Sequence, residues 1–142
     1  VQEIAGAQWP EIRPQLLAYM QQHGHISSKL DIYLQEGLLS EAIQAIDRSN
    51  AVFVYDRELD RVVAAAQDDY PDWGIAQYKA KAARIMDAGE AKSYDTAVGY
   101  LQKARRIYLH HNRQGAWQTY LDGLLDTHHR KYKLVPMLRQ IR

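Results

Sequence analysis

Two short segments, Gly37-Leu38-Leu39-Ser40-Glu41-Ala42-Ile43 and Ser93-Tyr94-Asp95-Thr96-Ala97-Val98, share one pattern. In each, a large apolar residue stands three positions before an alanine, and an aliphatic residue follows. A glycine able to close a helix lies upstream of each segment's helix start. This pattern is typical of a helical hairpin, whose small alanine lets two helices approach closely. Repeated hairpins build α-solenoids, which bind other macromolecules more often than they catalyse reactions.

Around these segments, apolar residues recur at helical spacing in about eight stretches. The predicted helices begin near Pro10–Pro14, Ser28, Ser40, Asp56, Asp72, Ser93, Ala116 and Leu134. Ser28 and Ser40 are predicted N-caps, and Gly89 is a predicted C-cap. Residues 51–54 form an apolar run that we interpret as a buried connector, since no second strand is available to pair with it.

The spacing also predicts which face of each helix is buried. The clearest stripe, between residues 93 and 111, is Tyr94, Ala97, Val98, Leu101, Ala104 and Tyr108. The stripe predicted for the preceding helix is Trp73, Ala76, Ala80 and Ala83. Trp117 is expected to be largely buried against the 93–111 helix. The predicted fold is therefore all-α, an irregular solenoid-like stack of hairpins forming one domain over 1–142, with its only internal seam near 50–56.

Composition excludes several classes of protein. The 142 residues contain no cysteine, which rules out disulfides, thiol catalysis and cysteine-ligated zinc and fits a cytoplasmic location. No apolar run is long enough to span a membrane. Because the chain begins with Val1, we expect it to be a piece of a longer protein.

Charge is distributed unevenly along the chain. Residues 1–102 hold nine Lys and Arg against fifteen Asp and Glu, whereas residues 103–142 hold nine against two. A charge run is most often a solvated helix face, but this excess would also attract phosphates or an acidic protein surface. The predicted binding patch, expected to be continuous, comprises Arg105, Arg106, Arg113, Arg130, Lys131, Tyr132 and Lys133.

Candidate catalytic and metal sites are weak. Histidines occur in pairs at 23/25, 110–111 and 128–129. Because adjacent helical residues point about 100° apart, we predict no bound metal, and we predict helix-end roles for the pairs at 110–111 and 128–129. His128 is expected to lie in the core. Asp68, Asp69 and Asp72 lack the pattern of a calcium loop, and their charge suits the start of a helix. We therefore expect no enzymatic activity, no cofactor and no small-molecule substrate.

Ten tyrosines against one phenylalanine form an unusual aromatic composition. Tyr94, Tyr108 and Tyr120 fall on apolar stripes and are expected in the core. Tyr132 stands among basic residues, so a binding role and a solvated one are evenly balanced.

Two resemblances add to this reading. Gly37 to Ala42 and Tyr94 to Ala104 resemble the second half of a tetratricopeptide repeat, although the first halves match poorly. Over residues 56–142 the chain resembles the helical C-terminal region of bacterial SWIM zinc-finger proteins. That resemblance is carried by Tyr94-Asp95-Thr96-Ala97-x-x-Tyr100-Leu101 and by Trp117-x-x-Tyr120-Leu121-x-x-Leu124-x-x-x-His128-x-Arg130-Lys131-x-x-Leu134-x-x-Met137-Leu138. In that family a separate upstream module binds zinc through cysteines and a histidine, so no zinc ligand is carried over to this chain.

Together these features predict a non-catalytic module that binds a protein partner or acts as a scaffold within a larger protein of the SWIM type. The alternative is nucleic-acid binding through the basic helices of residues 103–142. Structural support or self-association for a parent chain remains a third class.

Overall fold

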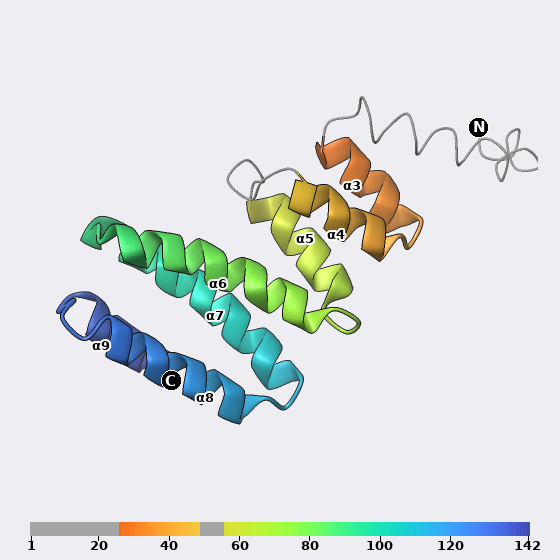
Figure 1. Ribbon diagram of the computed structural model, residues 1–142. Helices are drawn as coiled ribbons and strands as arrows, with labels where there is room; N and C mark the ends of the chain where they lie inside the picture. The colour runs from red at the N-terminus through yellow and green to blue at the C-terminus, as the bar shows by residue number, and fades with distance from the viewer. Residues whose placement is uncertain (1–25, 49–55) are drawn as a thin grey trace, which may run out of the picture. The chain divides into compact units, whose positions relative to one another are not determined.

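The computed structural model describes residues 26–48 and 56–142, and every regular element in these ranges is helical (Figure 1). The elements are α3 (Ile26–Gln35), α4 (Leu39–Arg48), α5 (Asp56–Ala66), α6 (Pro71–Ala88), the 3-10 helix η2 (Ala91–Ser93), α7 (Tyr94–His110), α8 (Gln114–Thr127) and α9 (Leu134–Gln140). The prediction of an all-helical fold is thus confirmed for these ranges, which hold seven α-helices against about eight predicted for the whole chain. The predicted helix ending near residue 24 and the connector at 51–54 lie outside the described residues.

The chain divides into two compact units, residues 1–65 and 66–142, and each is described by itself. Within the described ranges, no helix combines the length and the apolar character that crossing a membrane requires.

In unit 1, α3 and α4 form a hairpin closed by Gly37. This glycine has φ +71°, a left-handed conformation that costs other residues steric strain. The amide of Leu38 donates to the carbonyl of Tyr33 (2.7 Å), and the amide of Gly37 donates to that of Leu34 (3.3 Å). This pair of bonds is the Schellman arrangement, which satisfies carbonyls left open at a helix C-terminus. The predicted role of Gly37 is confirmed.

The predicted N-caps of these two helices are wrong, because both helices begin before the predicted serines. α3 begins at Ile26 and α4 at Leu39, so Ser28 and Ser40 lie inside the first turns. The apolar positions follow the prediction more closely, because the hairpin buries Leu30, Tyr33, Ala42 and Ile46.

α5 begins at Asp56 and buries the apolar stripe predicted for it. The buried residues are Leu59, Val62, Val63 and Ala66. Arg61 donates to Asp31 over 2.6 Å, which joins α5 to α3 at the surface of unit 1.

In unit 2, α6 has Pro71 at its start and Gly89 as its C-cap, as the sequence predicts. Gly89 has φ +72°, and its amide donates to the carbonyl of Met86 (3.1 Å). The predicted buried face of α6 is wrong. Ala76 and Ala80 are exposed, whereas the buried residues are Gly74, Ile75, Tyr78, Ala82 and Met86.

α7 is the central helix of unit 2, since it contacts α6, α8 and α9. All six residues of its predicted stripe are buried, and Ile107 joins them. The side chain of Trp117 on α8 is 0% exposed, and its ring lies 5.9 Å from that of Tyr108 on α7. The predicted burial of Trp117 against α7 is confirmed. The turn between α7 and α8 contains Asn112 at φ 57°.

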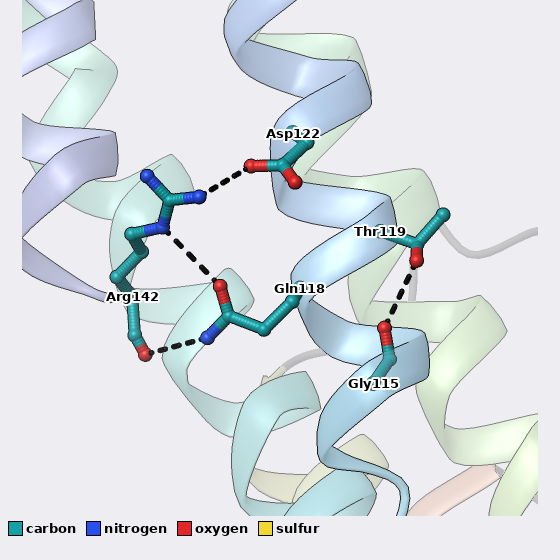
Figure 2. Close-up of polar contacts among 5 residues, drawn as sticks. All are labelled: Gly115, Gln118, Thr119, Asp122 and Arg142. Atoms are coloured by element: carbon teal, nitrogen blue, oxygen red, sulfur yellow. Dashed lines mark hydrogen bonds and ion pairs between the residues drawn. The ribbon is translucent and has the colours of Figure 1, made fainter.

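α9 packs on both α7 and α8 and buries Leu134, Leu138 and Ile141. Figure 2 shows how Arg142, beyond the end of α9, is attached to α8. Its guanidinium donates to Asp122 (2.8 Å) and Gln118 (3.2 Å), and its carbonyl accepts from Gln118 (3.4 Å). Figure 2 also shows Thr119, whose hydroxyl donates to the carbonyl of Gly115 one turn earlier.

Candidate functional site

The residues predicted to form one basic patch all lie in unit 2, but the structure separates them. Arg105 and Arg106 lie on α7, and Arg113 is the N-cap of α8. The other four lie in the connection between α8 and α9, residues 128–133, which we call the Tyr132 loop. α8 has 14 residues, and a helix of that length extends about 21 Å. The length of α8 therefore separates Arg113, at one end of the helix, from the Tyr132 loop at the other end.

Three of these cations have partners inside unit 2. Arg113 forms an ion pair with Asp72, near the start of α6. Arg105 donates from Nε to the carbonyl of Arg142 (3.3 Å). Lys131 donates to the carbonyl of Met86. Three of the six cations that the sequence analysis assigned to ligand binding thus already have partners within unit 2.

The remaining three cations are Arg106, Arg130 and Lys133. All three are exposed, and none makes an ion pair or a side-chain hydrogen bond with a residue in 26–48 or 56–142. Arg130 and Lys133 both belong to the Tyr132 loop.

Tyr132 is the most exposed large hydrophobic residue that the structure describes. Its side chain is 86% exposed, and Tyr70, at 44%, is the next. A tyrosine with a free ring and a cationic residue on either side offers an amphipathic contact at low cost in side-chain entropy. Tyr132 therefore has the properties of a contact residue rather than of a core residue.

The Tyr132 loop is held in place by its own turns and by Lys131. The amide of Lys131 donates to the carbonyl of His128 (2.9 Å), and that of Leu134 donates to the carbonyl of Lys131 (3.0 Å). The Lys131 Nζ donates to the carbonyl of Met86 (2.6 Å) and to Nδ1 of His128 (2.8 Å). The loop is therefore hydrogen-bonded to the last turn of α6, and this bond holds the segment that carries the exposed Tyr132.

His128 is buried, with 5% of its surface exposed, as the sequence predicts for a core residue. Because an ammonium group only donates, Nδ1 of His128 must carry a lone pair, which places the ring proton on Nε2. Burial lowers the pKa of His128 below its ordinary value, the positive charge of Lys131 lowers it further, and Asp87 opposes both. The neutral ring is thus the form that fits this site.

A second group of aromatic and basic side chains joins α6, α7 and α8. The rings of Tyr78 and Tyr100 stack at 6.4 Å. Lys103 lies over both of these rings. Lys79 lies 4.0 Å from the ring centre of Tyr120, whose pKa is raised to about 12 by burial and by nearby Tyr108. Cations over aromatic faces stabilise packing, so these residues serve the helix interfaces.

The histidine pairs at 110–111 and 128–129 occupy helix ends, as predicted, whereas the pair at 23/25 lies outside the described residues. One of the two described pairs has a neighbour that the sequence does not reveal. His129 bonds locally to the carbonyl of Asp126. His110, at the end of α7, lies against Asp68, and His111 lies against the carbonyl of Gln67. About 40 residues of sequence separate these partners, so no local spacing could have indicated the contact.

Neither a protein-family model, nor a curated protein, nor a solved structure matches this chain.

Proposed function

We propose that this chain is a non-catalytic helical module that binds an acidic protein partner, with the Tyr132 loop at the centre of the contact. The observation that carries the proposal is the 86% exposure of Tyr132 between the basic residues of the loop. Tyrosine and arginine are the residue types that most often dominate the free energy of protein binding. Arg130 and Lys133, which have no described partner, would meet carboxylates on the other protein.

The hydrogen bonds that hold the Tyr132 loop in place also support the proposal. A loop that is ordered before binding loses less conformational entropy on association. Lys131 gives that order through its bonds to Met86 and His128. In this scheme Lys131 positions the loop, while Arg130, Tyr132 and Lys133 touch the partner.

The proposal extends to the architecture and to the parent protein. We propose that the helical hairpins belong to an irregular stack of the tetratricopeptide type, part of a larger bacterial cytoplasmic protein of the SWIM kind. The hairpin at Gly37 and the burial of Ala42 and Ala97 support this view, because close helix contacts at alanine are typical of such repeats.

A selection from random displayed peptides, with the purified chain as bait, tests the function. Enriched peptides should be acidic and should contain an apolar or aromatic anchor. Tyr132→Ser should weaken their binding by at least about tenfold, in line with the loss of one dominant contact residue. Tyr70→Ser removes the other tyrosine that is exposed among the described residues and should leave binding unchanged. Peptides without acidic residues, or equal effects of the two substitutions, would contradict the proposal.

Labelled duplex and single-stranded DNA test the nucleic-acid alternative. Three phosphate contacts, from Arg106, Arg130 and Lys133, would reduce the affinity for duplex DNA about 40-fold between 50 and 200 mM salt. On the protein-partner proposal, DNA should bind weakly at both concentrations. Tight DNA binding at 50 mM salt that Arg130→Glu/Lys133→Glu abolishes would replace the proposed function with nucleic-acid recognition.

A further inference from the structure

Asp68, His110 and His111 bring three metal-ligating side chains together at one end of unit 2. Asp68 lies in the turn between α5 and α6, His110 is the last residue of α7, and His111 is its C-cap. The Asp68 Oδ1 lies 3.2 Å from Nε2 of His110. One ligand atom from each of the three residues lies within 4.8 Å of the others.

A hydrogen bond of His111 to the main chain and an ion pair outside the three residues hold the two segments in this arrangement. Nε2 of His111 lies 2.7 Å from the carbonyl oxygen of Gln67. Arg113 pairs with Asp72 on the far side of the same turn. The left-handed conformation of Asn112 turns the chain back, and the amide of Arg113 donates to the carbonyl of Tyr108 (2.8 Å). The group is therefore fixed by contacts on both segments.

The hydrogen bond of His111 also determines which ring nitrogen is free. A carbonyl only accepts, so Nε2 of His111 carries the proton and Nδ1 carries the lone pair. A metal-bound histidine usually donates its other ring N–H to a carbonyl or carboxylate in this way. The contact with Gln67 thus presents His111 in the form that a metal ion requires.

We propose that Asp68, His110 and His111 bind one divalent transition-metal ion of the zinc class. Two imidazoles and one carboxylate suit Zn²⁺, Ni²⁺ and Cu²⁺ better than Mg²⁺ or Ca²⁺, which prefer oxygen ligands. Tetrahedral ligands at zinc–nitrogen distances lie about 3.3 Å apart. The His110–Asp68 separation already matches this value, and rotation of the exposed side chains closes the wider pair.

The burial of the three residues indicates what kind of site this is. The side chains of His110 and Asp68 are 56% and 78% exposed. An ion would reach them directly from solvent, and water would complete its coordination, as in zinc sites with three protein ligands. The site is thus exchangeable and open to a ligand from a partner, unlike a closed structural zinc site.

The expectation of no metal considered the histidine pairs and the carboxylates of Asp68, Asp69 and Asp72 separately. Adjacent histidines on a regular helix diverge, but His111 has left the helix, with φ −99° and ψ 17°. The third ligand comes from a distant turn. The position of His111 outside the helix and the ligand from a distant turn therefore remove the reason for expecting no metal.

Isothermal titration of the full chain, without any added histidine tag, with ZnCl₂ tests the proposal. One Zn²⁺ should bind per chain at pH 7.5, and Co²⁺ should give visible absorption bands of low-symmetry coordination. Zn²⁺ binding should be weakened by at least about tenfold in each of the variants His110→Gln, His111→Gln and Asp68→Asn. Substitution of residues that only hydrogen-bond to metal ligands already reduces metal affinity by that amount. The affinity should fall at acidic pH, because a histidine must be neutral to bind the ion.

His129→Gln is the matched control, because it removes an exposed histidine that bonds only to Asp126. Its Zn²⁺ affinity should equal that of the unchanged chain, and circular dichroism should show that every variant keeps its helix content. Absence of stoichiometric binding, or equal losses in His129→Gln and His110→Gln, would overturn the proposal. The peptide-binding test of the Tyr132 loop is independent of this result, because α8 separates the two sites.

Discussion

Lys131 donates a hydrogen bond from Nζ to the main-chain carbonyl of Met86, 2.6 Å away and 45 positions earlier in the sequence. Met86 lies in the last turn of α6, where helix carbonyls lack partners within the helix. The amide of Gly89 already donates to the carbonyl of Met86, and Lys131 adds a second, charge-assisted hydrogen bond to the same oxygen. The lysine also complements the negative end of the helix dipole. Lys131 therefore acts as a C-terminal cap for α6 supplied from another part of the chain.

Lys131→Met should lower the free energy of unfolding by about 1–2 kcal/mol, because it removes a partly buried charge-assisted hydrogen bond but keeps an apolar stem of similar length. Urea unfolding followed by circular dichroism measures the change. Lys133→Met, two residues away and exposed, should stay within about 0.5 kcal/mol of the unchanged chain. Equal effects of the two substitutions would show that the bond to Met86 contributes nothing.

His128 should make stability depend on pH. Its pKa in the folded chain lies below the unfolded value of about 6.5, so the unfolded state binds the proton more readily. The stabilisation is complete above about pH 6.5 and is lost as the pH falls through the folded pKa. The difference in stability between the unchanged chain and His128→Gln, measured by urea unfolding at several pH values, should decrease toward low pH. A constant difference would contradict the shift.

The neighbours of His128 should move its pKa in opposite directions. Lys131→Met removes a positive charge and should raise the pKa of His128, whereas Asp87→Asn removes a negative charge and should lower it. Titration of the histidine ring resonances by NMR gives both values. Shifts of the same sign in the two variants would contradict this electrostatic assignment.

Trp117→Ala should lower the free energy of unfolding by about 3–5 kcal/mol, because the side chain is fully buried between Tyr108 and Tyr120. Trp117→Phe should cost less than about 2 kcal/mol. It keeps an aromatic ring and removes an indole N–H that finds no acceptor among the described residues. Thermal and urea unfolding measure both. A cost below about 1 kcal/mol for the alanine variant would mean that the site is not well packed.

Two glycines with open space around them should respond to alanine in opposite ways. Gly89 has φ +72°, so Gly89→Ala should destabilise the chain by about 1 kcal/mol through backbone strain. Gly123 lies inside α8 with no atom near the added methyl group, so Gly123→Ala should stabilise the chain by about 0.5–1 kcal/mol. Melting temperatures of the two variants should therefore move to opposite sides of the unchanged chain. Shifts of the same sign would contradict this.

The helices that could be predicted best are those whose large apolar residues follow one stripe. On α7 the residues from Tyr94 to Tyr108 fix a single face, and the structure buries that face. On α6 alanines occur on two faces of the helix, so the spacing of apolar residues did not identify a single buried face. The face with Ile75, Tyr78 and Met86 is buried because these side chains remove more apolar area from water than Ala76 or Ala80 would.

The candidate sites were less predictable, because charge pairing depends on tertiary contacts. The sequence marked Arg113 and Lys131 as cations free to bind a ligand. Asp72 and the carbonyl of Met86, both more than 40 positions away, occupy them instead. The basic neighbours of Tyr132 allowed it to be identified as a candidate contact residue from the sequence. Its exposure became evident only from the structure, in which other apolar residues form the core. Asp68 could not be connected with His110 from the sequence at all.

The order of packing in unit 2 has a consequence for how fast it folds. Each of its long helices lies against the next one along the chain, with α6 on α7, α7 on α8, and α8 on α9. Contacts of short sequence separation require little loop-closure entropy before they stabilise the chain. Helical topologies of this kind fold on the order of microseconds to milliseconds. The bonds from Lys131 to Met86 and from Arg113 to Asp72 span far longer loops. We therefore expect them to form after the helical hairpins and to slow unfolding more than they speed folding.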